Sequence, residues 1–353
     1  IKLAIDEVVK KIGKEKPTID DFRQYAPTDD MGANVKRIML DQLQNATFEE
    51  FYSAQIARGY DHFKSQLDYN LNLEYDPRTI VGDDPNNSKE RFYGNNDVAG
   101  PDAGHGSHVA GIIGADRTNE LGIKGVADNV LIMGVRNVPN GDERDKDVAN
   151  AIRYAVDNGA KVINMSFGKG YSWDKKVVDG AVKYAVSKDV LLVHAAGNDN
   201  KNLEVEQNYP NPHYEGGGIA SSWITVGASG WKNDGTIKAN FSNYGKTTVD
   251  VFAPGVNINS TIPGSKYAKF NGTSMASPVV AGLAALIRSY YPKLKANEVK
   301  DIIMKSVVKV DQTVNIGDDE ETAGNTVHFS ELCVTGGIVN AYNALKLASE
   351  YKK

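Results

Sequence analysis

The sequence predicts an α/β fold, with helices on both faces of a mostly parallel β-sheet, preceded by an N-terminal all-helical unit. Four short apolar runs have the length and β-branched content of buried strands: residues 130–135, 161–166, 190–195 and 224–228. Helical periodicity over residues 147–158 and 173–187 falls between these runs. Strands that alternate with helices are typical of a parallel sheet, because each crossover helix carries the chain back across one face.

The composition is that of an ordinary globular protein. Of the 353 residues, 41% are hydrophobic and 24% are charged, and a net charge of −5 gives no electrostatic case for binding nucleic acid. No apolar run reaches the length of a membrane span. The single cysteine, Cys333, rules out an internal disulfide framework, and we expect it to be a small buried side chain.

Residues 1–75 are predicted to form the helical unit, and residues 76–353 the α/β domain. In the first part, apolar residues recur at helical spacing, and residues 18–21 and 47–50 each have the pattern of a capping box, which begins a helix. The stretch 76–104 is rich in turn-forming residues and is expected to be a loop. The helical unit carries no motif for chemistry.

A glycine turn leads directly into a buried helix at residues 271–287, NGTSMASPVVAGLAALI. Val279 and Leu283 lie at helical spacing, so Ser274 is expected at a helix N-terminus. Unpaired backbone N–H groups and the helix dipole favour negative charge there, which suits a nucleophile whose attack creates an oxyanion. A simple N-cap role is the alternative for such a serine. Pro278 fits the pattern if it lies in the first helical turn, where its missing N–H costs little.

Two further segments place polar side chains beside small residues. Residues 104–114, GHGSHVAGIIG, put His105 at the start of another predicted helix. Residues 190–198, VLLVHAAGN, form an apolar strand that ends in Asn198. An imidazole at one helix start can reach a serine at another, and a side-chain amide at a strand end is a good donor to a developing oxyanion.

Together these three motifs resemble those of the subtilases, the subtilisin-like serine peptidases, and the resemblance extends from about residue 93 to the C-terminal helix. It implies a subtilisin-like fold and an endopeptidase mechanism. Ser274 would be the nucleophile, His105 the general base and then acid, and Asn198 a donor in the oxyanion hole. The resemblance makes His108 structural, and a His105–His108 metal pair lacks a nearby glutamate and an obvious third ligand.

By the same resemblance, a peptide or protein substrate lies as an added strand beside two sheet edges. These edges would form the walls of the first pocket: Ser166, Phe167 and Gly168 on one side, and Ala195, Ala196 and Gly197 on the other. The chemistry requires no cofactor and no catalytic metal. The turn at residues 116–122 lies where some subtilases bind structural calcium; its spacing differs, and a plain polar turn is the alternative.

The catalytic aspartate is the member of the family's triad that the sequence does not show. In the family it follows an apolar strand and precedes a small residue and a glycine, and no such segment lies before His105. Asp6 follows a short apolar run, but its surroundings have a helical period; Asp102 is too close to His105 in sequence to lie behind its ring. We therefore expect the strand that bears the acid to belong to a missing N-terminal segment, with the helical unit as an insertion between that strand and His105.

Two functions are consistent with these motifs. The first is a serine endopeptidase that is disarmed, or poorly active, in this chain alone because the acid is absent. The second is a non-catalytic relative that binds peptides in the cleft or a partner through the helical unit. The family implies an extracytoplasmic protein, secreted or at the cell surface. Its expected partners are the substrate and the missing N-terminal segment or a propeptide, with no nucleic acid and no membrane span.

Overall fold

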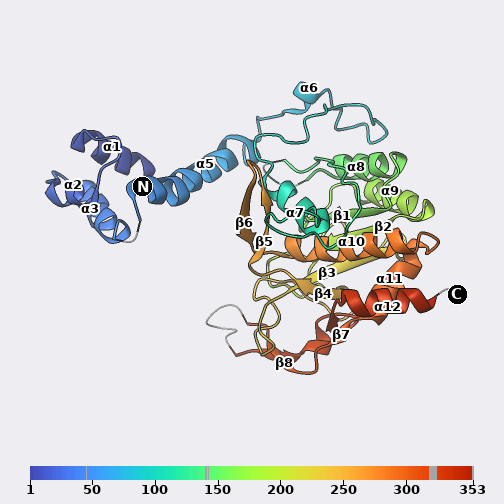
Figure 1. The fold of residues 1–353 in the computed structure, drawn as a ribbon. Coiled ribbons are helices and arrows are strands. Elements are labelled where there is room, and N and C mark those ends of the chain that lie inside the picture. The colour runs from blue at the N-terminus through green and yellow to red at the C-terminus, as the bar shows by residue number, and fades with distance from the viewer. Residues whose placement is uncertain (45, 140, 142, 318–323, 352–353) are drawn as a thin grey trace. The chain divides into compact units, whose positions relative to one another are not determined.

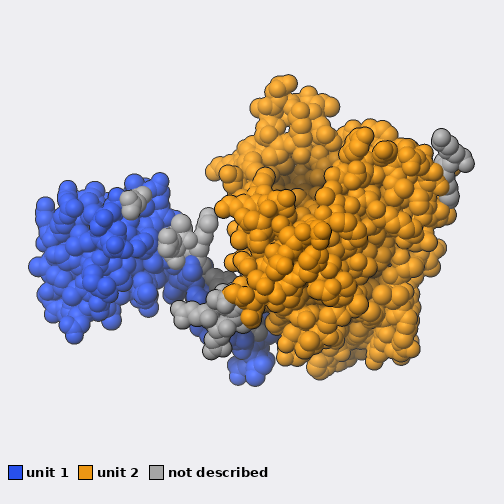
Figure 2. Space-filling view, turned by 90° about the horizontal axis from the view of Figure 1, so that it is seen from below, with its two compact units in different colours: residues 1–79 blue, residues 80–353 orange. Residues whose placement is uncertain are grey.

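The computed structural model describes residues 1–44, 46–139, 141, 143–317 and 324–351. These residues form two compact units, Ile1–Thr79 and Ile80–Lys353 (Figure 2). Each unit has hydrophobic clusters of its own, so each is described separately.

The first unit is helical, as the periodicity predicts. It contains α1 (Lys2–Ile12), α2 (Ile19–Gln24), α3 (Asp30–Gln42) and a long segment made of α4 (Phe48–Phe51), the π-helical η1 (Tyr52–Ala57), α5 (Arg58–Ser65) and the π-helical η2 (Gln66–Asn70). Both predicted capping boxes are confirmed, because Thr18 and Thr47 each accept a hydrogen bond from the backbone N–H three residues later. The apolar faces meet in one core: Ile5, Val8, Phe22, Val35, Met39, Leu43, Phe48 and Phe51. The short helix α6 (Arg78–Val81) follows.

The second unit is built on a sheet of six strands (Figure 1). The order across the sheet is β1 (Val162–Met165), β2 (Leu191–Ala195), β3 (Trp223–Ser229), β4 (Val251–Pro254), β10 (Gly337–Ile338) and β7 (Val308–Lys309). All neighbours are parallel except β10 and β7. Two hairpins lie outside this sheet: β5 (Ile258–Ile262) with β6 (Lys266–Phe270), and β8 (Thr313–Asn315) with β9 (Thr326–His328), which the 3₁₀ turn Phe329–Glu331 follows.

Helices cover both faces of the sheet, as predicted (Figure 1). On one face α8 (Asp145–Asp157) and α9 (Lys175–Ser187) pack with β1 and β2 around Met165, Leu192 and Trp223. On the other face α10 (Thr273–Tyr290), α11 (Ala296–Lys305) and α12 (Ala341–Tyr351) enclose the larger core. The central helix α10 contacts β1, β2, β3 and β4, so the residues at its N-terminus lie at the carboxyl ends of these strands.

Helix α7 (Gly104–Gly114) is fixed against the β5–β6 hairpin and against α10. A Cβ on Gly111 would lie 2.2 Å from Thr261 Oγ1, so this close approach requires glycine. The buried His108 donates through Nε2 to the carbonyls of Ile258 and Ala268, both at 3.0 Å. These contacts agree with the structural role expected for His108, and they fix the helix that begins beside His105.

The prediction of a strand at residues 130–135 is wrong, because the structure contains no strand there. Its apolar side chains have no sheet to cover, and Leu131 is fully exposed. Val130 and Ile132 instead lie near Gly114 at the end of α7. An isolated apolar segment does not become a strand without a neighbour that satisfies its backbone groups. In the part of the chain that the structure describes, the edge strand β1 pairs with β2 alone, and its first three residues are only half-buried.

Candidate active site

Ser274 is the second residue of α10, and its hydroxyl donates to the Ser166 carbonyl at 3.2 Å. Pro278 lies deeper in the helix than the first turn, as its sixth residue, which corrects the expectation from the sequence. A proline at this position cannot donate to the carbonyl four residues earlier, which belongs to Ser274. That carbonyl accepts the Ser166 hydroxyl instead, at 2.8 Å. The proline thus frees a backbone acceptor that joins α10 to the end of β1.

A chain of polar side chains extends this junction between α10 and β1. Ser277 donates to Asn164 Oδ1 at 2.7 Å, and Asn164 Nδ2 donates to the Ser166 hydroxyl at 2.9 Å. Each group in the chain therefore has a partner, which fixes the position of the helix start relative to the strand. Asn164 lies in the predicted strand 161–166 and Ser277 in the motif at residues 271–287, but the sequence alone assigned neither of them a role.

The amide of Asn198 has a defined orientation. Its Oδ1 accepts two hydrogen bonds from Thr273, from the backbone N–H at 2.8 Å and from the hydroxyl at 2.9 Å. A backbone N–H can only donate, so the oxygen rather than the nitrogen of the amide must face Thr273. The two N–H groups of Asn198 Nδ2 point elsewhere and, within the described part of the chain, have no hydrogen-bond partner. They are available to an acceptor at the start of α10.

Two asparagines hydrogen-bond to the backbone of the predicted wall at Ala195, Ala196 and Gly197. Asn208 and Asn243 each donate to the Ala196 carbonyl at 2.9 Å. Gly197 has φ of 104°, and a Cβ there would lie 2.3 Å from Asn243 Nδ2. Glycine is therefore required both by the backbone and by the closeness of Asn243. Sequence reasoning missed both asparagines, because each lies far along the chain from the wall that it supports.

His105 lies at the start of α7 and is exposed. Partial desolvation lowers the pKa of His105, the charge of His108 lowers it further, and Asp102 acts in the opposite direction. The imidazole is therefore neutral near pH 7, which is the form that a general base requires. Among the described residues, no hydrogen bond joins this ring to Ser274 or to a carboxylate; Asp102 accepts from the Gly104 N–H.

Asp6, the residue that follows a short apolar run near the N-terminus, belongs to the first unit. Lys2 forms an ion pair with one of its oxygens at 2.7 Å, and the Tyr52 hydroxyl donates to the other. Burial raises the pKa of Asp6, but Lys2 and Tyr52 outweigh it and hold the pKa below its usual value. These local contacts give Asp6 partners within the first unit, and our expectation that the acid lies on another segment stays a prediction.

His194 lies inside the sheet on β2 and is 2% exposed. Its Nε2–H donates to the Phe167 carbonyl at 2.8 Å, and its ring packs against that of Trp223. Burial lowers the pKa of His194 to about 4, so this ring is neutral at pH 7.

We expect this burial to make stability depend on pH. Below about pH 6.5 the unfolded histidine gains a proton, whereas the folded one gains it only near pH 4. The contribution of His194 to the free energy of unfolding should therefore be constant above pH 6.5 and fall by about 3 kcal/mol between pH 6.5 and 4. Urea denaturation of the wild type and of His194→Gln at several pH values measures this contribution, and parallel curves for the two proteins would contradict it.

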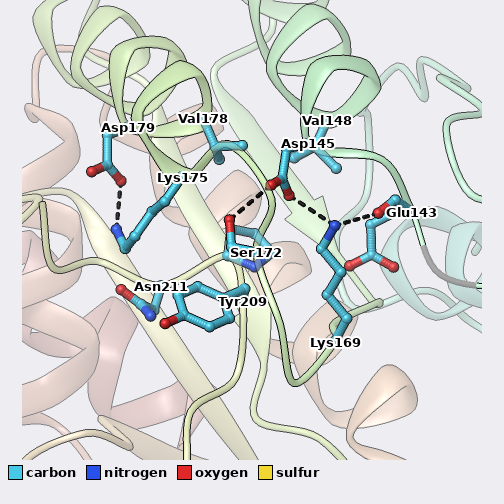
Figure 3. A pocket seen from close by; sticks show the side chains of 11 residues that line it. Glu143, Asp145, Val148, Lys169, Ser172, Lys175, Val178, Asp179, Tyr209 and Asn211 are labelled. Atoms are coloured by element: carbon cyan, nitrogen blue, oxygen red, sulfur yellow. Dashed lines mark hydrogen bonds and ion pairs between the residues drawn. The ribbon is translucent and has the colours of Figure 1, made fainter. Parts of the chain in front are cut away.

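A small cavity of about 10 Å³ lies behind the other wall, where Lys169 follows Gly168 (Figure 3). The Lys169 ammonium lies 2.8 Å from Asp145, and both side chains are nearly buried. Ser172 and the Asp174 N–H donate to the same carboxylate. Burial raises the pKa of Asp145, but Lys169 and these two donors outweigh it and hold the pKa below its usual value.

Breaking this pair is expected to destabilise the second unit. Lys169→Met leaves Asp145 buried without its cation, which should lower the free energy of unfolding by about 3–5 kcal/mol. Lys176→Met on the exposed side of α9 is the matched control, with an expected change within about 0.5 kcal/mol. Urea denaturation measures both. Equal stability of the two variants would show that the pair contributes nothing.

The turn proposed for calcium is closed by its own side chains. Asp116 Oδ1 accepts from the N–H and the hydroxyl of Thr118, and Asn119 Oδ1 accepts from the Leu121 N–H. Across the described residues, no three His, Cys, Asp or Glu side chains are grouped as a metal site would require. These contacts are those of a polar turn, and calcium binding here stays a prediction.

The fold and the site define an α/β protein with a serine at a helix N-terminus, a histidine at the start of a neighbouring helix and an anchored asparagine amide. A model of the subtilase family matches residues 54–331. The chain therefore belongs to the subtilase family, and the resemblance read from the three motifs is confirmed.

Curated relatives match part of the chain. It is 45% identical over 186 residues, 52% of this chain and 42% of the relative, to the "Thermophilic serine proteinase" of Bacillus sp. (strain AK1). It is 39% identical over 232 residues, 65% of this chain and 24% of the relative, to the "Cell wall-associated protease" of Bacillus subtilis (strain 168). The chain thus spans less than half of the length of these two relatives.

Solved structures confirm the subtilisin-like α/β fold. The prenylagaramide maturation protease PagA has a TM-score of 0.54 at 25% identity, over 69% of this chain and 82% of that one. A protease of Pseudoalteromonas arctica PAMC 21717 has a TM-score of 0.54 at 30% identity, over 69% and 70% of the two chains. Where the structure describes the chain, none of its helices has the length and apolar character needed to cross a membrane.

Proposed function

We propose that this chain is a serine endopeptidase of the subtilisin type that hydrolyses peptide bonds through an acyl-enzyme. Ser274 Oγ attacks the peptide carbonyl while His105 takes its proton and then gives it to the leaving amine. Water, deprotonated by His105, releases the acyl group. Asn198 Nδ2 and the Ser274 N–H donate to the oxyanion. The observation that carries this proposal is the pair of hydrogen bonds from Thr273 to Asn198 Oδ1, which leaves Asn198 Nδ2 free to donate to the oxyanion.

The substrate of this proposed reaction is an extended peptide or protein segment, bound without a cofactor. The segment would lie between the wall Ser166, Phe167, Gly168 and the wall Ala195, Ala196, Gly197, each of which continues from the end of a parallel strand. Export to an extracytoplasmic location, secreted or at the cell surface, is part of the same proposal and rests on the family alone.

We further propose that the triad acid is supplied by an additional strand that pairs with the open edge of β1. Among the described residues, this edge strand has a neighbour on one side only, and Val162, Ile163 and Asn164 are half-buried. The open edge of β1 presents backbone N–H and C=O groups that have no neighbouring strand. Strands of a parallel sheet are normally buried on both faces, so this edge favours the addition of another strand. Until that strand is bound, the site would lack its acid and turn over slowly; the segment that bears it, or a propeptide, would be a partner of this chain.

A second function is favoured by one observation: within the described part of the chain, no carboxylate accepts a hydrogen bond from His105. A relative that binds peptides in the cleft, or a partner through the helical unit, without hydrolysis would need no acid. It would hold a peptide between the same walls, and Ser274 would not react.

Labelling with a fluorophosphonate distinguishes the two functions, because the probe reacts with an activated serine and loses fluoride. We expect the chain to gain one probe mass at Ser274 and Ser274→Ala to gain none, as read by intact mass and peptide mapping. Adding the acid-bearing strand in trans should raise the rate. Peptide binding together with an absence of labelling, with and without the added strand, would favour the binding relative.

A further inference from the structure

The two proposed walls leave the sheet where direct pairing between their strands ends. The ladder between β1 and β2 stops at Met165 opposite His194, one residue before each wall begins. Beyond the far end of the first wall, Lys169 and Tyr209 exchange two backbone hydrogen bonds, of 3.0 and 2.8 Å. Tyr209 lies outside the second wall, so this pair fixes only the end of the first wall. The β1–β2 ladder does not reach the residues of either wall, and other contacts have to set the distance between them.

The imidazole of His194 bridges this interval. Its Nε2–H donates to the carbonyl of Phe167, the middle residue of the first wall, at 2.8 Å. Because a carbonyl can only accept, this bond fixes the tautomer with the proton on Nε2. The ring is itself held in place, since its centroid lies 5.4 Å from that of Trp223 and 6.5 Å from that of Phe167, with Phe167 edge-on.

The position of His194 relates the two walls directly. It is the residue immediately before Ala195, so its ring joins the start of the second wall to the middle residue of the first. At the same time its bond occupies one of the two lone pairs of the Phe167 carbonyl. A leucine at this position would fill space but would leave the carbonyl of the half-buried Phe167 without this donor.

We propose that His194 is a positioning residue that sets the separation of the two walls of the first pocket, and so determines how large a substrate side chain the pocket accepts. The inference rests on the proposed function, which makes these segments the walls of a substrate pocket. His194 touches no reacting atom in this role. It acts through the Phe167 carbonyl.

Amide hydrogen exchange tests the wall itself and requires no activity. His194→Leu removes the donor, whereas His194→Gln keeps an N–H at a similar reach. We expect the amides of residues 166–168 to exchange about tenfold faster in His194→Leu than in the wild type, and near the wild-type rate in His194→Gln. Val193 and Ile224, paired in the adjacent ladder, serve as internal controls that should not change. Equal exchange in the Leu and Gln variants would show that the side chain only fills space, and would overturn the proposal.

Peptide aldehydes that differ only in the side chain entering the first pocket test the effect on specificity. Each adds reversibly to Ser274: the Oγ–carbon bond forms, and the aldehyde oxygen takes up the proton and becomes a hydroxyl. We expect the ratio of affinities for phenylalanine over alanine to change about tenfold in His194→Leu and to return in His194→Gln; an unchanged ratio would overturn the proposal. If no aldehyde binds the wild type, the proposed function fails, and the exchange rates alone decide whether His194 holds the wall.

Discussion

Replacement of His105 by alanine is expected to slow the acylation of Ser274 by a factor that reveals whether an acid is in place. In subtilisin, the namesake of this family, loss of the histidine alone costs about 2 × 10⁶ in turnover, and loss of the aspartate alone about 3 × 10⁴. If an acid already supports His105, the variant should approach the larger loss. If no acid supports His105, the wild-type chain is already slowed by about the cost of losing the aspartate. Loss of His105 should then slow acylation by only the ratio of the two costs, about 70-fold.

The geometry of the site explains why this measurement is informative here. Asp102 is the carboxylate that acts on the pKa of His105, and its Oδ1 is engaged by the Gly104 N–H. An effect near 70-fold would therefore support our proposal that the acid arrives on a strand added to β1. An effect near 10⁶ would mean that a carboxylate of this chain reaches the ring, and would contradict it.

The rate of fluorophosphonate labelling, followed by intact mass, is measured for the wild type and for His105→Ala. The ratio of the two rates distinguishes a loss near 70-fold from one near 10⁶-fold. His213→Ala is the matched control, since His213 is an exposed histidine outside the site. It should label at the wild-type rate. Labelling of His105→Ala at the wild-type rate would remove His105 from the mechanism altogether.

The strands that the sequence predicted correctly are those that pair with a neighbouring strand in the structure. Residues 161–166, 190–195 and 224–228 each contain a strand of the sheet, because apolar β-branched runs flanked by helices carry enough local information. The run at 130–135 has the same composition and forms no strand. Whether a run is paired depends on a partner elsewhere, which periodicity does not reveal.

The three motif residues of the site could be found because each stands beside glycines at the end of a predicted element. The residues that hold these three side chains in place could not be found from the sequence. Thr273, which orients Asn198, was visible as part of a motif but not as an anchor; Asn208 and Asn243 support a wall that lies many residues away in the sequence. Side-chain to backbone bonds of this kind leave no period or spacing in the sequence, because the fold alone brings the partners together.

Replacement of Asn198 by aspartate is expected to lower the rate of Ser274 acylation by about 10²–10³-fold while the protein stays folded. The aspartate keeps an oxygen for both bonds from Thr273, so the local structure survives. It removes the two N–H groups of Nδ2 and places a negative charge where an oxyanion develops. Asn198→Ala should lose the same donor and, in addition, leave the buried Thr273 N–H without its acceptor.

Thr273→Val separates the donation from the anchoring. The valine keeps the backbone N–H bond to Asn198 Oδ1 but removes the hydroxyl bond, and with it the acceptor for the Gly197 N–H. The amide is then present but less firmly oriented, so we expect a smaller loss than for Asn198→Asp, on the order of tenfold. Labelling rates for the three variants, each checked by circular dichroism, should rank Asn198→Asp and Asn198→Ala below Thr273→Val, and Thr273→Val below wild type. A wild-type rate for Asn198→Asp would show that the amide donates nothing to the transition state, because that variant changes the donor while it keeps the anchor.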